Sequence, residues 1–445
     1  MSSTVATVEA AVTTAPAQRL RTSVKSWLPW LGKGSLAVAD QGLFAGSNFL
    51  LNVLLARWLT PADYGAFALA YSIFLLLLLL HNALLTGPML VFGPGKYRQR
   101  FREYLGVVLR GHFVLIIPVT ALLISTAFLL GWVYSPGVER AFLALAAAGP
   151  LILLLWLLRR AFYVLLNPGW SATSGGIYLL ILLGSAVTLH VIGRLTPATG
   201  FLAMGAASFI ASLLLVVLLQ PRLANNSLSI RAIAADHWRY GKWVVAAAGP
   251  NWVTDNAYFL VLPAWVSLAE AGALKALLNL AMPALQTIAA VGVLLLPILV
   301  RDRHLGGPRA MMRTIKLCLG LFLLGSASYL LVLWGFRLEM FRLLYAGKYG
   351  TYASWPLLLA ALLPFAQSLT VVVGGALGAL ERPDLAFWPS VGSCTLTLAL
   401  GFPLAFNLGL GGALAGLVAS YILMGLFMLF FFAQAVCSKT LETRP

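Results

Sequence analysis

Polar and ionisable side chains recur at helical spacing inside long hydrophobic segments of this chain, where they could bind an ion or a polar substrate. Asn251, Thr254, Asp255 and Tyr258 fall at positions i, i+3, i+4 and i+7, which is one face of a helix. An ionisable side chain in hydrocarbon is costly and normally faces a bundle interior or a wet cavity. Asp255 is therefore a candidate ion-coupling residue, and the alternative is a local hydrogen bond that holds neighbouring helices together.

Three other hydrophobic segments carry polar side chains of the same kind. They contain Gln41, Asn48 and Asn52 with Asp40 on a neighbouring face, then His81, Asn82 and Thr86, and later Asn279, Pro283 and Gln286. We infer that these segments line a common hydrophilic cavity, in which Asn48, Asn251, Asn279 and Gln286 are candidate substrate-binding residues. The alternative for each amide is an interhelical hydrogen bond worth about 0.6 kcal/mol.

The remaining ionisable candidates each have a functional and a structural interpretation. Asp40 is a second candidate for ion coupling, but it lies within about two turns of the cytoplasmic interface, where hydration relieves much of its cost and favours a structural role. His81 could contact an anionic group when protonated, or it could bond to a neighbouring hydroxyl. Arg159 and Arg160 end a hydrophobic segment, where they either anchor the topology or turn inward to grip a phosphate through bidentate hydrogen bonds.

No motif for covalent or metal-dependent catalysis accompanies these residues. The turn Gly93-Pro94-Gly95-Lys96 lacks the spacing and the Ser or Thr of a nucleotide-binding loop. Cys318, Cys394 and Cys437 form no Cys-x-x-Cys pair. We therefore predict no catalytic residues, no metal site, no cofactor and no enzymatic activity, and any uphill transport would need an ion gradient.

The elements that must position these residues are membrane helices. Hydrophobic residues make up 61% of the 445 residues and charged residues only 10%, which excludes a soluble globular protein. Stretches long enough to cross a bilayer, about 20 residues each, lie at about 35–56, 64–92, 105–131, 141–165, 172–192, 199–219, 243–266, 273–300, 314–334, 355–380, 385–406 and 412–436. Their runs are continuous rather than alternating, which argues against a β-barrel. The predicted fold class is an all-α integral membrane protein with about 12 transmembrane helices.

The net charge is +17, and the Lys and Arg residues behind it are distributed unevenly between alternate connections of the spans. One alternate set of connections carries 23 of the 30 Lys and Arg residues. The opposite set carries the other seven, which are Arg57, Arg140, Arg194, Lys275, Arg337, Arg342 and Lys348. By the positive-inside rule both termini are cytoplasmic. Topology and contact with anionic membrane lipids account for this charge, so nucleic-acid binding is not expected.

The chain repeats its own pattern about 210 residues further along. Gly32-Lys33 and Pro88-Met89-Leu90-Val91 recur as Gly241-Lys242 and Pro297-Ile298-Leu299-Val300, both with an offset of 209. Two related membrane bundles in one chain are typical of secondary transporters, and with six spans per half both lobes have the same orientation. We predict a cytoplasmic tail and interfacial helix over 1–34, an N-terminal six-helix lobe over 35–220, a cytoplasmic linker over 221–240, a C-terminal six-helix lobe over 241–437 and a cytoplasmic tail over 438–445.

Several stretches carry a family resemblance. They are Asp40-Gln41, Ser47–Leu51, Leu55–Gly65 and Pro88-Met89 in the first half, and Leu344–Tyr349, Leu377–Pro383 and Leu408–Ala415 in the second. Over about 35–435 the sequence resembles the polysaccharide flippases (Wzx-like, O-antigen or exopolysaccharide) of the multidrug/oligosaccharidyl-lipid/polysaccharide (MOP) exporter superfamily. The resemblance implies a two-lobed bundle of the bacterial inner membrane that opens alternately to the cytoplasm and the periplasm. It implies that an undecaprenyl-pyrophosphate-linked oligosaccharide moves from the cytoplasmic to the periplasmic leaflet, driven by an ion gradient.

The resemblance also implies partners and a binding site. The partners are the lipid-linked oligosaccharide, membrane lipids, and a polymerase and chain-length regulator of the same pathway. The site is a cationic cavity for pyrophosphate and sugar, for which the sequence offers His81, Arg57, Arg159 and Arg160.

Three other functions remain as alternatives. A cation-coupled small-molecule or drug antiporter of the same fold would need a compact cation site around Asp255. A membrane-embedded polymerase or glycosyltransferase would need a large outer loop, whereas the longest one expected, 335–354, is short. A structural scaffold is disfavoured by the polar stripes on corresponding helices of both halves.

Overall fold

The chain folds into long α-helices, and the computed structural model describes residues 15–222, 228–380, 382 and 384–442. No strand occurs among these residues, so the all-α class is confirmed. Eight helical runs in this part of the chain are long and apolar enough to cross a membrane. The runs Leu268–Gly335 and Asp384–Val436 each supply two spans, because Gly307 (φ 71°) and Gly409 (φ 58°) break the helix there.

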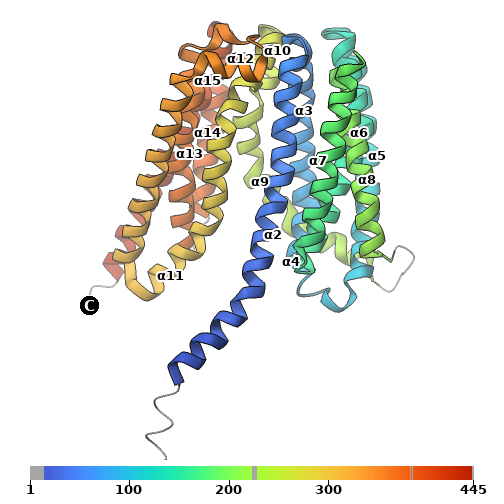
Figure 1. Ribbon diagram of the computed structural model, residues 1–445. Helices are drawn as coiled ribbons and strands as arrows, with labels where there is room; N and C mark the ends of the chain where they lie inside the picture. Colours follow the sequence, from blue (N-terminus) through green and yellow to red (C-terminus); the bar gives the residue numbers. More distant parts are fainter. Residues whose placement is uncertain (1–14, 223–227, 381, 383, 443–445) are drawn as a thin grey trace, which may run out of the picture.

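The helices form two lobes, which Figure 1 shows side by side. The first lobe contains α2 (Ala15–Trp58), α3 (Pro61–His81), the π-helix η1 (Asn82–Thr86), α4 (Gly87–Phe92), the 3-10 helix η2 (Arg98–Arg100), α5 (Phe101–Val133), α6 (Pro136–Val164), α7 (Pro168–Val191) and α8 (Pro197–Leu219). The second contains α9 (Ile230–Asn256), α10 (Tyr258–Trp265), α11 (Leu268–Gly335), α12 (Arg337–Tyr345), the 3-10 helix η3 (Gly350–Tyr352), α13 (Trp355–Ala379), α14 (Asp384–Leu396), the π-helix η4 (Thr397–Gly401) and α15 (Phe402–Glu442). With α2 and the α9–α10 pair counted as spans, the bundle agrees with the expected twelve or so.

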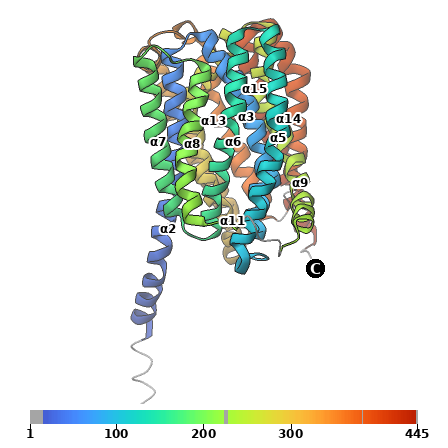
Figure 2. The same ribbon diagram turned by 90° about the vertical axis from the view of Figure 1, so that its right-hand side faces the viewer.

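The two described chain ends lie on one side of the bundle. Figures 1 and 2 show the start of α2 and the end of α15 at the same end of the molecule, and Figure 1 shows α12 at the other end. We call the first side the terminal face, which the charge pattern predicts to be cytoplasmic, and the second the opposite face.

Several helices begin at side chains that cap them. Thr60, Ser135 and Thr196 each accept a hydrogen bond from a backbone N–H three residues on, and each is followed by proline at the first helical position. Such a cap satisfies a donor that the helix cannot, and proline there loses no helical hydrogen bond. The sharp starts of α3, α6 and α8 on the opposite face follow from this local chemistry.

The two lobes meet most closely where α3 and α11 begin. A Cβ added to Gly65 would overlap the carbonyl oxygen of Leu268, and one added to Gly272 would overlap the carbonyl oxygen of Pro61. Small residues let helix backbones approach in this way. The contact is reciprocal. On α3, Gly65 comes four residues after Pro61, and on α11, Gly272 comes four residues after Leu268.

Helices run across two of the expected boundaries. The interfacial helix expected before residue 35 is continuous with the first span, because α2 runs unbroken from Ala15. The expected linker 221–240 is helical from Ile230, where Ser229 caps α9. Residues 1–14, part of the expected tail, lie outside the described residues.

Candidate substrate cavity

Two adjoining cavities lie between the lobes. The N-side cavity, of about 530 Å³, is lined by α2, α3 and α11. The C-side cavity, of about 270 Å³, is lined by α3, α9, α10, α11, α13 and α15. Leu75, Lys275, Met282 and Gln286 line both. The cavities therefore meet along one face of α11, between the lobes.

Lys275 is the charge at this junction. Its side chain lies two turns into α11, and the residue is only 7% exposed. The Nζ atom lies 4.6 Å from the centroid of the Tyr71 ring and 5.7 Å from that of Phe259, and no ion pair to it occurs among the described residues. Cation–π contacts of this kind stabilise a desolvated cation by about 2 kcal/mol. Its positive charge therefore remains available to an anion in either cavity.

Asp255 lines the C-side cavity together with Lys275. The hydroxyl of Tyr421 on α15 donates a hydrogen bond of 2.6 Å to its carboxylate. The structure thus contains the local hydrogen bond considered as the alternative, and it also places the carboxylate at the wall of a cavity. Ion coupling by Asp255 stays a prediction.

Amides and tyrosines form the polar wall of the N-side cavity. Asn279 donates to the Tyr64 hydroxyl at 2.8 Å, and that hydroxyl donates to the Asn52 side chain at 3.2 Å. Tyr178 donates to Asn48 at 3.2 Å. Asn48, Asn52 and Asn279 all line the cavity, so their bonds orient amides that a substrate can reach.

The other two predicted amides differ in their surroundings. Gln286 is exposed and lines both cavities. Asn251 lines a separate cavity on α4 and α9 beside Tyr240 and Trp243, so the structure does not bring it together with the others.

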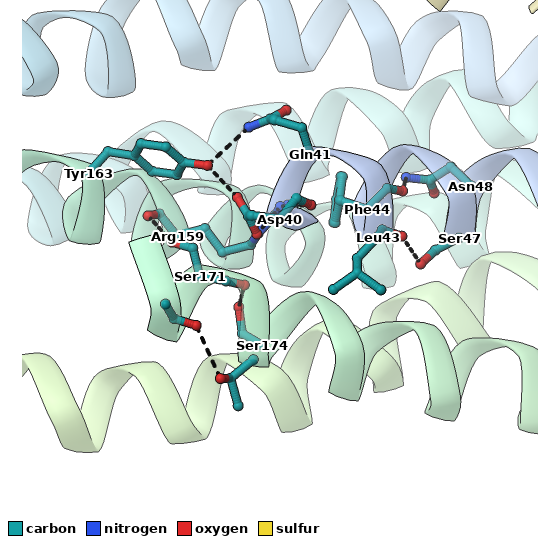
Figure 3. Close-up of polar contacts among 12 residues, drawn as sticks. Asp40, Gln41, Leu43, Phe44, Ser47, Asn48, Arg159, Tyr163, Ser171 and Ser174 are labelled. Carbon is teal, nitrogen blue, oxygen red and sulfur yellow. Dashed lines mark hydrogen bonds and ion pairs between the residues drawn. The ribbon is translucent and has the colours of Figure 1, made fainter. Parts of the chain in front are cut away.

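Asp40 and Arg159 bind each other inside the first lobe. The Arg159 guanidinium donates to the Asp40 carboxylate at 2.7 Å, and Tyr163 donates to the other carboxylate oxygen at 2.6 Å, as Figure 3 shows. Arg159 also lies 3.9 Å from the centroid of the Phe44 ring. Asp40 and Arg159 are 0% and 3% exposed, and neither lines the N-side or C-side cavity. The pair joins α2 to α6, and ion coupling by Asp40 and phosphate binding by Arg159 stay predictions.

Arg160 and His81 also lie away from these cavities. The guanidinium of Arg160 lies 4.9 Å from the Trp156 ring centroid, on α6 among the aromatic residues of the first lobe. His81 is 1% exposed and bonds to His112 and Thr86. Neither residue lines the two cavities between the lobes.

The sequence interpretation missed Lys275 because it counted this residue among the charges that flank the spans. Lys275, Asn279 and Gln286 fall at i, i+4 and i+11, which is one helical face. Extending the polar stripe of Asn279 one turn backward would have found the lysine.

The lobes are joined on the opposite face by charged side chains that bond to backbone. Lys348 donates to the carbonyl oxygens of Arg57 and Leu59, both at 2.7 Å, and Arg57 donates to the carbonyl of Leu343. Together with the Gly65–Gly272 contact, these bonds close the bundle on that face.

On the terminal face, α9 packs against the first lobe. Lys96 pairs with Asp236 and holds the pKa of that carboxyl below its usual value of 3.8. His237 bonds to the Tyr104 hydroxyl at 2.7 Å and to the Leu84 carbonyl at 2.9 Å. Burial lowers the pKa of His237 from 6.5, so the ring is neutral at physiological pH.

Solved structures share this arrangement of helices. An inward-facing multidrug resistance MATE family transporter of the MOP superfamily superposes with a TM-score of 0.76 at 12% identity, covering 92% of this chain and 100% of the other. The lipid II flippase MurJ, in an inward closed conformation, gives 0.70 at 13% identity, covering 89% and 86%. The chain shares the fold of these two transporters. No model of a known protein family matches the sequence, and a search of curated proteins finds no match either.

The structure superposes better on an inward-facing than on an outward-facing transporter of this fold. An outward-facing MATE structure gives a TM-score of 0.54 at 12% identity, covering 92% of this chain and 93% of the other, lower than the 0.76 of the inward-facing one. This difference fits the closed contacts of Arg57, Lys348 and Gly65 on the opposite face.

Proposed function

We propose that the protein is a flippase for an undecaprenyl-pyrophosphate-linked oligosaccharide, which it moves from the cytoplasmic to the periplasmic leaflet of a bacterial inner membrane. Two observations support a transporter of this kind: the resemblance of the sequence to polysaccharide flippases, and a fold shared with a protein described as a lipid II flippase. Both termini are cytoplasmic in this proposal, and the pathway's polymerase and chain-length regulator are the expected partners.

One observation carries the choice of an anionic substrate. Lys275 is the only residue with a formal charge among the described residues that line the N-side cavity, and it has no carboxylate partner there. An unpaired buried cation is costly, so a site that keeps one gains by binding an anion. A pyrophosphate can supply that anion.

The amides beside Lys275 complete the proposed site. Asn279 lies one turn after Lys275 and Gln286 two turns further on, while Asn48 faces the same cavity from α2. Amide groups donate and accept hydrogen bonds, as sugar hydroxyls do. In this proposal Lys275 holds the pyrophosphate and the amides hold the first sugars.

Transport then requires the contacts of the opposite face to open. Lys348, Arg57 and the glycines Gly65 and Gly272 join the lobes there. Release toward the periplasm would break these bonds while the terminal face closes, which is alternating access about the site between two like-oriented lobes.

A cation-coupled small-molecule antiporter is the second candidate, and Asp255 favours it. Its carboxylate lines the C-side cavity, where it could bind a cation. Lys275 in the same wall opposes a cationic substrate, because like charges in a cavity of low polarity repel strongly.

The deciding experiment measures on which leaflet lipid-linked oligosaccharide accumulates after the gene is deleted. A membrane-impermeant sugar label with mass spectrometry would detect the periplasmic pool. We expect accumulation on the cytoplasmic leaflet, loss of surface polysaccharide, and rescue by the wild type but not by Lys275→Gln. Normal delivery of the oligosaccharide to the periplasmic leaflet, in a strain without a second flippase, would refute the proposed flippase function and favour the antiporter.

A further inference from the structure

Two histidines that the proposed transport site does not use face each other inside the first lobe. His81 at the end of α3 and His112 on α5 are each 1% exposed. The Nε2 atom of His81 lies 3.0 Å from the Nδ1 atom of His112. The Nδ1 atom of His81 lies 3.3 Å from the hydroxyl of Thr86. The pair is buried between two helices, apart from the cavities.

The geometry sets how many protons the pair can hold. One ring must donate a hydrogen bond to the other across 3.0 Å. When both rings are neutral, the His81–His112 and His81–Thr86 bonds can both form, because the Thr86 hydroxyl can donate to or accept from His81. One additional proton can be held with both bonds intact, since His81 then donates from both nitrogens. A second additional proton would point two N–H groups at each other. The site therefore accepts one proton and excludes two.

The His81–Thr86 bond depends on the local π-helix. Residues five apart lie about 140° apart around an α-helix, too far for their side chains to meet. The π-helix η1, Asn82–Thr86, brings them onto one side, and such π turns occur often at functional sites. A change in the His81 bonds therefore acts on the shape of this turn.

The same turn contacts the second lobe. Pro88 has no N–H, so the carbonyl of Leu84 lacks its α-helical donor. His237 on α9 supplies a hydrogen bond to that carbonyl at 2.9 Å. The carbonyl of Ala83 lies against Gly241 of α9, where an added Cβ would come within 2.6 Å of it. The histidine pair is thus connected through η1 to the contact between the lobes.

No carboxylate competes for the proton. Besides α3 and α4, the elements packed against η1 are α5, α6 and α9. Their ionisable groups toward the terminal face are Arg102, Glu103, Tyr104 and Arg110; Arg159, Arg160 and Tyr163; and Arg231, Asp236, His237, Arg239, Tyr240 and Lys242, while Glu139 and Arg140 of α6 and Asp255 of α9 lie farther along these helices. On α3 the ionisable groups are Asp63, Tyr64 and Tyr71, and α4 has none. Glu103 and Asp236 already pair with arginine or lysine, and Asp63 bonds to Thr60. None of these groups bonds to His81 or His112 in the described part of the chain.

We propose that the His81–His112 pair binds the coupling proton of this transporter, one per cycle, and that its occupancy shifts η1 and the α9 contact. Only the coupling of this proton to transport rests on the proposed function, because proton binding and the lobe movement can both be measured without substrate. In the conformation described here the pair is sealed, so the proton enters and leaves in another state of the cycle.

The test measures the distance between the lobes against pH. In a full-length protein without native cysteines that carries His237→Asn, which removes the separate pH response of His237, spin labels at Gly95 and Leu305, both exposed on the terminal face, report that distance in lipid nanodiscs from pH 5 to 8. We expect the distance distribution to shift with pH in this background and in His304→Gln, an exposed histidine that serves as the matched control. The shift should be lost in the double variant His81→Gln/His112→Gln. Thr86→Val keeps both rings but removes the hydroxyl, and it should change the pH midpoint of the distance shift.

A second measurement counts the protons. Histidine ¹⁵N NMR of the same samples should show one proton gained by the pair across the transition. A pH response that survives in the double variant, a background protein with no response, or uptake of two protons would each overturn the proposal. If the double variant does not fold, the midpoint in Thr86→Val decides, and an unchanged midpoint overturns it. None of these outcomes bears on whether the substrate is a lipid-linked sugar, which the leaflet assay decides separately.

Discussion

Replacing Lys275 tests the anionic cavity most directly. Lys275→Gln removes the charge and keeps a polar side chain, while Lys275→Arg keeps the charge. Because Lys275 lines both cavities and pairs with no carboxylate of the described residues, the substitution changes one charge and breaks no ion pair seen there. We expect Lys275→Gln to lose affinity for a prenyl pyrophosphate and to fold at least as stably as the wild type, since it removes a buried unpaired cation.

The expected loss follows from the bond that a phosphate would make. A hydrogen bond to a charged group contributes about 1.5–3 kcal/mol, and each 1.4 kcal/mol is tenfold in affinity. The weakly polar surroundings of Tyr71 and Phe259 place Lys275 toward the upper end of this range. Lys275→Gln should therefore weaken binding by roughly 10- to 150-fold, with Lys275→Arg closer to the wild type.

The assay is equilibrium binding of farnesyl pyrophosphate to the protein in nanodiscs at fixed ionic strength. Farnesol, which has the same chain and no charge, separates the phosphate contact from the tail contact. Lys242→Gln is the matched control, because Lys242 is exposed on α9. Surface charges are screened by salt, so this variant should bind like the wild type.

Binding by Lys275→Gln within about twofold of the wild type, where the hydrogen-bond estimate requires at least tenfold, would refute the reasoning. An equal loss of farnesol and pyrophosphate binding would also refute it, because the lysine would then act through the shape of the cavity alone.

Three further outcomes follow from the contacts between and within the lobes. Gly65→Ala should open the opposite face, because its Cβ would overlap a backbone oxygen of α11; cysteine labelling there should rise, with Gly320→Ala, which has open space, as the control. Asp40→Asn should destabilise the fold by about 3–5 kcal/mol, because it leaves the buried Arg159 charge unpaired; thermal unfolding measures this, and equal stability would contradict it. The pKa of His237 is lowered by burial, so its contribution to the α9 contact is complete above pH 6.5 and is lost as the pH falls through the lowered value. Hydrogen exchange of α9 should therefore rise in acid, and His237→Asn should reduce that pH dependence.

The class of the fold was predictable because composition and span length are strong physical constraints. Apolar runs without alternation leave only helices as spanning elements, and the structure confirms an all-α bundle. The breaks inside the helical runs were harder to place. Gly307 and Gly409 turn the chain through a positive φ, but most other glycines of the spans lie within regular helix, and the sequence offers no rule that separates the two uses.

The site was predictable only as a set of polar helical faces. Asn48, Asn279 and Gln286 do meet at the N-side cavity, because period and span order place them on neighbouring helices. His81, Asp40 and Arg159 instead found partners on helices distant in sequence, 31 residues apart for His81 with His112 and 119 apart for Arg159 with Asp40. Such pairings depend on which helices pack together, and one sequence read along its length does not contain that information.

The contacts on the two faces differ in a way that bears on transport. On the opposite face the lobes meet through backbone: Gly65 and Gly272 pack against carbonyl groups, and Lys348 and Arg57 bond to carbonyls. On the terminal face α9 meets the first lobe through titratable side chains, His237 and Asp236. The glycine–backbone contacts do not change with pH, whereas the His237 side chain does. A ligand or proton can shift a conformational equilibrium only by the difference in its binding free energy between the states. In the proposed function, protonation of His237 would loosen the terminal face, and the glycine contacts of the opposite face would set a fixed cost that an anion bound at Lys275 must offset.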